Sequence, residues 1–229
     1  MSTDICFPKN NELEFIKKAE KIGISNLIFV YLYKKDVLDY KEKMKELQMK
    51  TRINLMLSLI ADDKDIQKAK NISNLIIARS SEKNHQVLET FKPDLICGLE
   101  NSNKKDKMHY RYSSLNQVLC KICNKNKIIV GFSFSTLLNS SPKNKVIILG
   151  RIMQNILFCR KYKISVFIGS FAENPFKLRY SRDLSSLLKV LGASDMQIKE
   201  SQNSVMNKIK QNTQKRDKNY ISEDITLVE

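Results

Sequence analysis

The chain has 229 residues, of which 42% are hydrophobic, so it can form one large domain or two small ones around a sizeable core. It contains no apolar run of roughly 18 residues, and its N-terminal residues lack an apolar segment. We therefore expect neither a membrane span nor a signal peptide. The composition favours a cytoplasmic protein with no membrane partner.

The net charge of +16 is concentrated in the middle of the chain. Residues 1–100 contain 17 basic and 15 acidic residues, residues 101–192 contain 17 and 3, and residues 193–229 contain 6 of each. An excess confined to one block is typical of proteins that bind a polyanion, whereas a uniform excess favours solubility alone. A solvated basic face without a partner is the alternative interpretation.

Seven short apolar runs alternate with amphipathic stretches along the chain. The runs are continuous rather than alternating, which is typical of parallel strands that are buried on both faces. They cover residues 4–7, 27–32, 53–60, 75–78, 94–97, 128–134 and 165–170. The helical patterns between them cover residues 11–22, 36–48, 62–70, 82–91, 113–125 and 142–162. This order predicts an α/β fold with about seven parallel strands, either a barrel or a doubly wound sheet.

Few residues in the sequence are suited to catalysis or metal binding. No glycine-rich dinucleotide or P-loop motif follows any predicted strand. Cys6, Cys97 and Cys159 lie in apolar contexts and are predicted to be buried thiols. Cys120 and Cys123 lack the second ligand pair that a zinc site needs, so we expect two reduced cysteines on one helical turn. The two histidines, at positions 85 and 109, lie in polar stretches and are predicted to be on the surface.

The segment FKLRYSRDLSSLLKVLG, residues 176–192, predicts a basic loop that leads into a helix. Ser181 is the expected N-cap, Asp183 suits the first turn, and Gly192 is placed to end the helix. Arg179 and Arg182 beside a helix start could bind phosphate. The alternative is a solvated turn that only begins a helix.

The sequence RYSRDLSSLLKVLG resembles the RxPRDL…LG segment of archaeal ribonuclease P protein component 3, the relative of the eukaryotic thirty-kilodalton subunit. Other segments agree in order and spacing, so that the resemblance covers most of residues 70–195. They are NLIIARS, PDLICG, SSLNQVLCKICNKNKIIVGFSFSTLL and RIMQNILFCRKYKISVFIGSFA. Two positions depart from the family pattern, because Ser181 stands where proline is usual and Ala193 where methionine is usual.

The resemblance implies a TIM-barrel-like fold, whose functional loops follow the C-terminal ends of the strands. We expect one barrel domain over residues 1–200, and a polar C-terminal helix at about 203–212 with a flexible tail within residues 201–229. The implied function is that of a protein subunit of ribonuclease P, the endonuclease (a hydrolase) that removes the 5′ leader of precursor tRNA. The RNA subunit would carry out the chemistry with magnesium, so we expect no cofactor and no catalytic or metal-binding residue in the protein. The implied partners are the ribonuclease P RNA, precursor tRNA and other protein subunits, especially one that resembles component 2.

The resemblance also transfers candidate RNA-binding residues to matching positions. They are Lys121, Arg179 and Arg182 and, less directly, Lys83 and Lys104 or Lys105. Charge alone adds Arg111, Lys143, Lys145, Arg151 and Lys163, and the basic loop before the predicted helix adds Lys177. Tyr110, Tyr112 and Tyr180 alternate with arginines and could stack on unpaired bases, although each could equally be half-buried packing. In the alternative interpretation Arg182 is structural and pairs with Asp183 or Glu173.

Two other functions are open at this stage. A stand-alone barrel phosphoesterase or nuclease of the polymerase-and-histidinol-phosphatase type would need a histidine-rich metal cluster that begins near the first strand, where this chain has DICFP. That alternative is therefore disfavoured. A basic RNA-binding module of another ribonucleoprotein would share the charge but not the motifs.

Overall fold

The computed structural model describes residues 2–34, 37–61, 65–102, 105–216, 220–222 and 225–226. Seven strands form one sheet, and each pairs in parallel with the next along the chain. They are β1 (Thr3–Cys6), β2 (Asn26–Leu32), β3 (Asn54–Ile60), β4 (Ile76–Arg79), β5 (Leu95–Cys97), β6 (Ile129–Ser133) and β7 (Val166–Gly169). All seven predicted strands are therefore confirmed, within a few residues at their ends.

The sheet closes into a nearly complete barrel at the seam between β1 and β7. Cys6 forms a parallel bridge with Ala172, and the backbone N–H of Phe7 donates to the carbonyl of Ala172 at 2.8 Å. The carboxylate of Asp4 spans the same seam, because its Oδ1 accepts a hydrogen bond from the N–H of Ser170 at 2.6 Å. The TIM-barrel-like α/β fold is thus confirmed.

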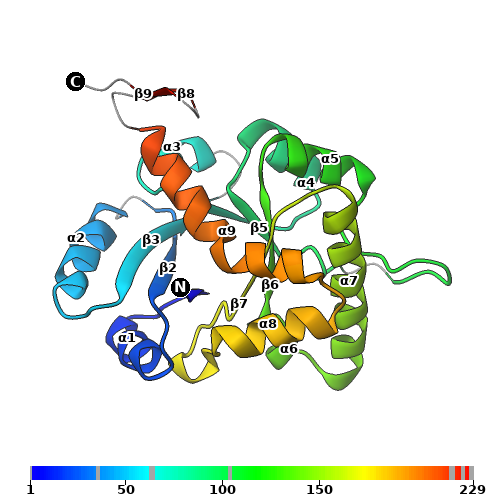
Figure 1. The fold of residues 1–229 in the computed structure, drawn as a ribbon, viewed down its shortest axis with the longest axis horizontal. Helices are drawn as coiled ribbons and strands as arrows, with labels where there is room; N and C mark the ends of the chain where they lie inside the picture. The colour runs from blue at the N-terminus through cyan, green and yellow to red at the C-terminus, as the bar shows by residue number, and fades with distance from the viewer. Residues whose placement is uncertain are drawn as a thin grey trace.

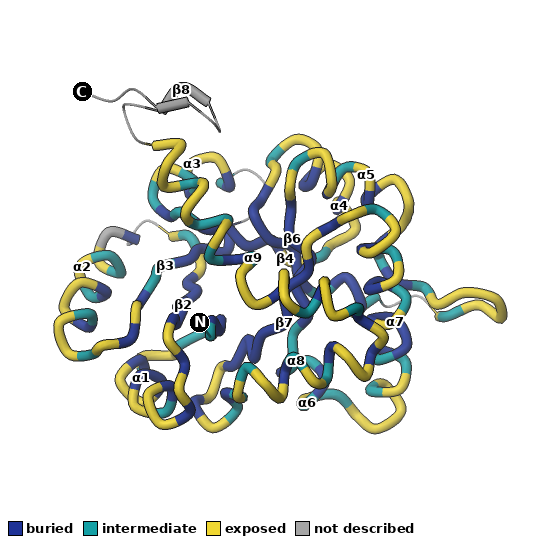
Figure 2. Tube along the Cα trace, in the orientation of Figure 1, coloured by how far each residue is buried: buried dark blue, intermediate teal, exposed yellow. Residues whose placement is uncertain are grey.

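The continuous apolar runs follow from burial on both faces of each strand. Inward side chains such as Ile5, Ile77 and Leu95 fill the barrel, while outward ones such as Phe29 and Val130 pack against the surrounding helices. Figure 2 shows the strands as a buried centre, with exposed residues on the outer sides of the helices.

The helices surround the barrel and agree largely with the predicted pattern (Figure 1). They are α1 (Glu12–Lys21), α2 (Val37–Gln48), α3 (Ile66–Lys70), α4 (Asn84–Gln86) with a π-helical turn at Val87–Phe91, α5 (Gln117–Lys125), α6 (Phe134–Asn139), α7 (Pro142–Lys161), α8 (Ser181–Val190) and α9 (Asp195–Gln214), with a 3₁₀ turn at Pro175–Lys177. Helix α5 begins later than predicted because Asn116 caps it by accepting a hydrogen bond from the N–H of Leu119. The short helix α6 was not predicted.

Helix α9 covers the end of the barrel at which the strands begin, and it crosses that end in Figure 1. Val205 and Ile209 pack into the barrel core, and the amide of Asn212 donates to Asp94 and to the carbonyl of Asn74. The helix is longer than the predicted 203–212, and the expected domain boundary at residue 200 falls inside it. Beyond it, β8 (Tyr220–Ser222) and β9 (Ile225–Thr226) pair antiparallel, and the rest of the expected flexible tail lies outside the described residues.

All five cysteines are free and buried. Burial was predicted for Cys6, Cys97 and Cys159, and Cys120 and Cys123 lie on one turn of α5 as free thiols, also as predicted. Within the described ranges, each helix is too short or too polar to cross a bilayer. His85 and His109 are both exposed, as predicted, and His85 lies 3.4 Å from the carboxylate of Glu89.

Candidate functional site

The parallel topology places most of the predicted cations at one end of the barrel. Lys83 follows β4, Lys105 and Arg111 follow β5, and Lys177, Arg179 and Arg182 follow β7. Because all seven strands run in the same direction, these loops meet at the C-terminal face, where barrels place their sites. Lys121 lies one turn into α5 and is exposed, and Lys104 lies outside the described residues.

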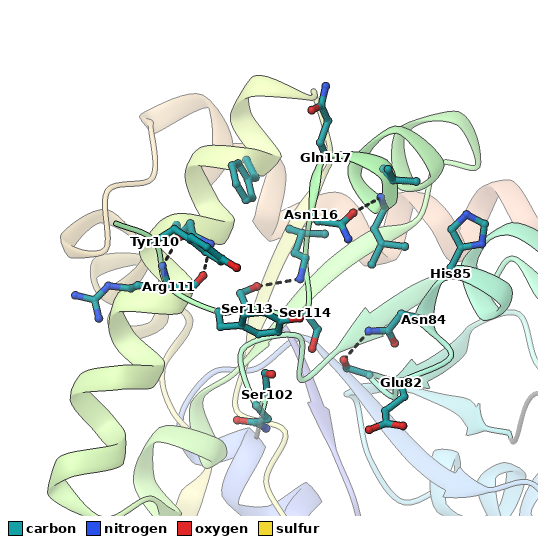
Figure 3. A pocket seen from close by; sticks show the side chains of 18 of the residues that line it. Glu82, Asn84, His85, Ser102, Tyr110, Arg111, Ser113, Ser114, Asn116 and Gln117 are labelled. Carbon is teal, nitrogen blue, oxygen red and sulfur yellow. Dashed lines mark hydrogen bonds between the residues drawn. The ribbon is translucent and has the colours of Figure 1, made fainter. Parts of the chain in front are cut away.

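A groove of about 900 Å³ opens on this face between the loop that follows β4 and residues 110–119. We call it the groove. Figure 3 shows Tyr110, Ser113 and Asn116 on one side of it, and Asn84 and His85 on the other. Its lining consists mainly of hydroxyl, amide and aromatic side chains, which are the groups that contact unpaired bases.

Local hydrogen bonds shape the β4 side of the groove. Asn84 donates from Nδ2 to the Oγ of Ser80 at 2.9 Å, and its Oδ1 accepts from the N–H of Ser81 at 2.8 Å. The Oγ of Ser81 in turn accepts from the N–H of Lys83 at 3.2 Å. These bonds fix the backbone of Lys83 at the edge of the groove while its side chain is exposed.

The opposite wall is held by α7. Gln154 forms two hydrogen bonds with the backbone of Arg111, and Ser113 donates to Asn155 at 2.6 Å. The Arg111 guanidinium lies against Gly150, where a Cβ would be 2.2 Å from its Cζ, and one nitrogen is 3.6 Å from Asp106. Arg111 therefore packs along α7 while remaining exposed at the rim of the groove.

Two of the cations selected by charge alone do not belong to this surface. Arg151 is only 4% exposed, because its Nε donates to Asp106 at 2.8 Å and its Nη1 donates to the carbonyls of Glu100 and Ser102. Lys163 lies just before β7, at the opposite end of the barrel. Lys143 and Lys145, in the first turn of α7, are at the C-terminal face.

The carboxylate of Asp106 joins the two arginines to the loop. Burial tends to raise its pKa, but hydrogen bonds from the Tyr112 N–H and Arg151, together with the charges of Arg151 and Arg111, lower it below its ordinary value. Asp106 is therefore ionised at neutral pH and fixes residues 106–112 against α7. Because Arg151 pairs with Asp106 inside the protein, its side chain does not reach the surface.

The loop after β7 uses Arg179 to hold its own backbone. Its Nη1 donates to the carbonyls of Phe176 and Leu178 at 3.0 and 2.9 Å, and its guanidinium lies over the ring of Phe134. The neighbouring Lys177 donates to Asn139 at 2.6 Å. Both side chains retain access to solvent, so a phosphate could still reach them.

Arg182 differs from Arg179, because its guanidinium is exposed and has no hydrogen bond or ion pair to any described residue. The predicted alternative partner, Glu173, binds Lys9 at 2.7 Å instead. That contact is the main reason why the pKa of Glu173 is lowered. Arg182 thus lies in the first turn of α8 as a free cation.

The start of α8 departs from the prediction by one residue. Tyr180 occupies the N-cap position, and its carbonyl accepts from the N–H groups of Asp183 and Leu184, so Ser181 is the first helical residue and the predicted Ser181 cap is wrong. Asp183 lies in the first turn, and Gly192 follows the helix at φ +94°, both as predicted.

The prediction missed Arg79, which ends β4 at the centre of the C-terminal face. Its guanidinium lies 5.4 Å from the centroid of the Phe7 ring. The sequence feature that could have identified Arg79 is its position directly after the apolar run of residues 75–78. In the described part of the chain, no three His, Cys, Asp or Glu side chains come together in a way that could hold a metal ion.

Comparison with known proteins agrees with this architecture. Ribonuclease P protein component 3 of Methanosarcina acetivorans is 31% identical over 99 residues, covering 43% of this chain and 41% of the relative. The same component of Thermococcus kodakarensis is 29% identical over 155 residues, covering 64% and 65%. The chain thus spans about two-fifths to two-thirds of the length of these relatives.

A solved structure described as archaeal ribonuclease P with mature tRNA contains a similar chain, with a TM-score of 0.82, 16% identity and 98% coverage of both chains. At that identity the similarity shows the fold alone. A family profile described as RNase P subunit p30 matches residues 1–218. With most of its length matched, this chain belongs to the RNase P subunit p30 family.

Proposed function

We propose that this protein is an RNA-binding subunit of ribonuclease P that supports RNA-catalysed removal of the 5′ leader from precursor tRNA and is not catalytic by itself. The observation that carries the proposal is the collection of solvent-accessible cations from three separate loops on one face of a barrel of this family. Cations spread over one face can bind several phosphates of a folded RNA.

The proposed partners are the ribonuclease P RNA, its tRNA substrate and other protein subunits, especially one resembling component 2. The similar chain solved within an archaeal ribonuclease P with mature tRNA supports the first two. The proposed compartment is the cytoplasm, and magnesium would be held by the RNA subunit. The matches above do not favour a stand-alone phosphoesterase.

Reconstitution tests this function directly. Adding the protein and its cognate subunits to the ribonuclease P RNA should increase processing of precursor tRNA at moderate magnesium. The protein alone should leave the substrate intact. Processing that is unchanged by the protein would contradict the assignment. Sequencing the RNA that co-purifies with the protein would then show whether the protein belongs to another ribonucleoprotein.

Substitution of the two arginines beside α8 should separate phosphate binding from loop stability. Arg182→Ala should flatten the slope of log affinity against log salt by about 0.7–0.9 and leave the melting temperature unchanged, because one phosphate contact is lost. Arg179→Ala should also lower the melting temperature, since the carbonyls of Phe176 and Leu178 lose their donor. Filter binding at several salt concentrations and thermal denaturation measure both effects.

A wild-type salt slope for Arg182→Ala would show that this residue does not contact RNA. If Arg179→Ala melts like the wild-type protein, its contacts to the loop carbonyls contribute nothing measurable. Lys189→Ala is a matched control on the same helix, since Lys189 is exposed and pairs with Asp195 near the other end of α8.

Tyr180 lies between these arginines and is 52% exposed, so we expect it to stack on an unpaired base. Tyr180→Ala should weaken binding of single-stranded RNA by about one order of magnitude, because base–aromatic stacking contributes about 1–3 kcal/mol per base. Tyr180→Phe retains the ring and should bind like the wild-type protein. Equal loss in both variants would assign the effect to the hydroxyl group instead.

A further inference from the structure

A hollow of about 300 Å³ lies at the C-terminal end of the barrel, and we call it the barrel mouth. Its floor includes the rings of Phe7 and Phe171, whose centroids are 6.2 Å apart. Polar side chains from the ends of β4, β5, β6 and β7 line its walls; they are Arg79, Ser80, Asn101, Ser133, Ser135, Thr136, Asn139 and Glu173. None of the predicted RNA-binding cations lines it.

Arg79 is the strongest donor at the mouth. The inward alternation of β4 directs its side chain across the opening, so that the guanidinium lies over Phe7 from β1. No carboxylate of the described residues lies within ion-pair distance of it, and the side chain is accessible to solvent. A guanidinium held over a ring keeps its fork of N–H groups available to an anion.

Three serine hydroxyls add neutral donors. The Oγ of Ser80 accepts from Asn84 at 2.9 Å and the Oγ of Ser133 accepts from the N–H of Thr136 at 3.2 Å, so each can still donate its own proton. Ser135 is 6% exposed, and its Oγ has no hydrogen-bond partner in the described part of the chain. A buried hydroxyl without a partner at the wall of a hollow favours a ligand that supplies an acceptor.

The charge of the mouth favours an anion. Glu173 is the one carboxylate among the described lining residues, and Lys9 neutralises it at 2.7 Å. The charges of Arg79 and Lys177 also act on Glu173, which places both cations close to it. The described residues around the mouth therefore contribute three cations and one carboxylate.

We propose that the barrel mouth binds an oxyanion of the phosphate class, with Arg79 contacting its charge and Ser80, Ser133 and Ser135 donating hydroxyl hydrogen bonds. The phosphate can belong to an RNA backbone or to a free nucleotide, because both present the same group. The mouth adjoins the groove through the shared lining residues Ser80 and Asn101. The site goes beyond the proposed function because its proposed donors, Arg79 and the three serines, are not among the cations assigned there.

Calorimetric titration of RNA-free protein with inorganic phosphate tests the site. Saturable binding to one site is expected, and Arg79→Gln and Ser135→Ala should each weaken it by about tenfold, as for a lost hydrogen bond to a charged group. Arg160→Gln removes an exposed arginine on α7 and Ser186→Ala an exposed serine on α8, and both should bind phosphate normally. Circular dichroism confirms that each variant is folded.

Two further arms identify the source of the phosphate. If phosphate competes with RNA and Arg79→Gln weakens RNA binding, the ligand is the RNA backbone. If RNA affinity is unaffected while adenosine monophosphate competes with phosphate, the ligand is a free nucleotide. Two results would overturn the proposal: a binding heat that does not saturate with phosphate, or an equal loss of phosphate affinity in Arg160→Gln and Arg79→Gln. Either would mean that phosphate binds only to non-specific surface charge.

Discussion

Replacing Arg151 by methionine is expected to lower the free energy of unfolding by about 3–5 kcal/mol, which is the usual cost of removing one partner of a buried ion pair. The substitution retains the length of the side chain but removes every donor. Asp106 then loses its closest cation, and the carbonyls of Glu100 and Ser102 lose the hydrogen bonds donated by Arg151. For a chain of this size the melting temperature should fall by roughly 6–20 °C.

Thermal denaturation followed by circular dichroism measures this effect. Arg160→Met provides the matched control, since it makes the same change on the exposed side of the same helix. Among the described residues, the Arg160 side chain makes one contact, a long hydrogen bond to the carbonyl of Gly192. Its effect should stay within about 0.5 kcal/mol. Should both variants melt at the same temperature, the buried contacts of Arg151 would have no net stabilising effect.

Arg151 and Gln154 on α7 both support one wall of the groove. Arg151 binds the carbonyls of Glu100 and Ser102 and the carboxylate of Asp106. One turn further along α7, Gln154 binds the backbone of Arg111. The wall of the groove is therefore held by two successive residues of one face of α7, Arg151 and Gln154. Arg151→Met should weaken RNA binding indirectly, through the position of Arg111, and the salt slope should change less than it does in Arg182→Ala.

The sequence predicted the barrel well because strands buried on both faces have a recognisable apolar pattern. Each strand is short, continuous and apolar, and the seven runs follow one another in the order in which they pair. The short helix α6 has no such pattern, because six residues do not complete two turns of apolar spacing. The covering role of α9 was also missed, since its polar sequence contributes only a few residues, such as Val205, to the core.

The candidate site was predicted less completely, because formal charge does not reveal where a side chain points. Arg151 and Arg182 carry the same charge in the sequence, yet one is buried against Asp106 and the other is free on α8. Arg79 was overlooked because a single cation beside an apolar run resembles an ordinary strand end. Only the closure of the barrel brings it over Phe7, which is distant in sequence.

Two buried carboxylates should make the protein more stable in mild acid than at alkaline pH. Glu100 is 0% exposed, and neither carboxylate oxygen has a hydrogen-bond partner in the described part of the chain. Burial raises its pKa to about 7. Asp4, which is 2% exposed at the barrel seam, has its pKa raised to about 6, mainly by burial and despite its hydrogen bond from Ser170.

The sign of the effect follows from the direction of these shifts. A carboxyl group whose pKa is higher in the folded state favours folding while it is protonated, below its unfolded pKa near 4. That contribution is lost as the pH rises through about 6 for Asp4 and about 7 for Glu100. Below about pH 4 the opposite shifts of Glu12, Asp106 and Glu173 should lower stability again, so we expect a maximum near pH 5.

Chemical denaturation between about pH 5 and 8.5 tests this prediction. The free energy of unfolding of the wild-type protein should fall by several kcal/mol across this range, with roughly 3 kcal/mol from Glu100 alone, because one pKa unit corresponds to about 1.4 kcal/mol. Glu100→Gln cannot ionise, so the part of the decrease that ends near pH 7 should disappear, and Asp4→Asn should remove the part that ends near pH 6. Glu200→Gln, on the exposed side of α9, should retain the full decrease. A Glu100→Gln protein with the same pH dependence as the wild type would mean that Glu100 is ionised in the folded protein and is stabilised there by solvent or by a cation.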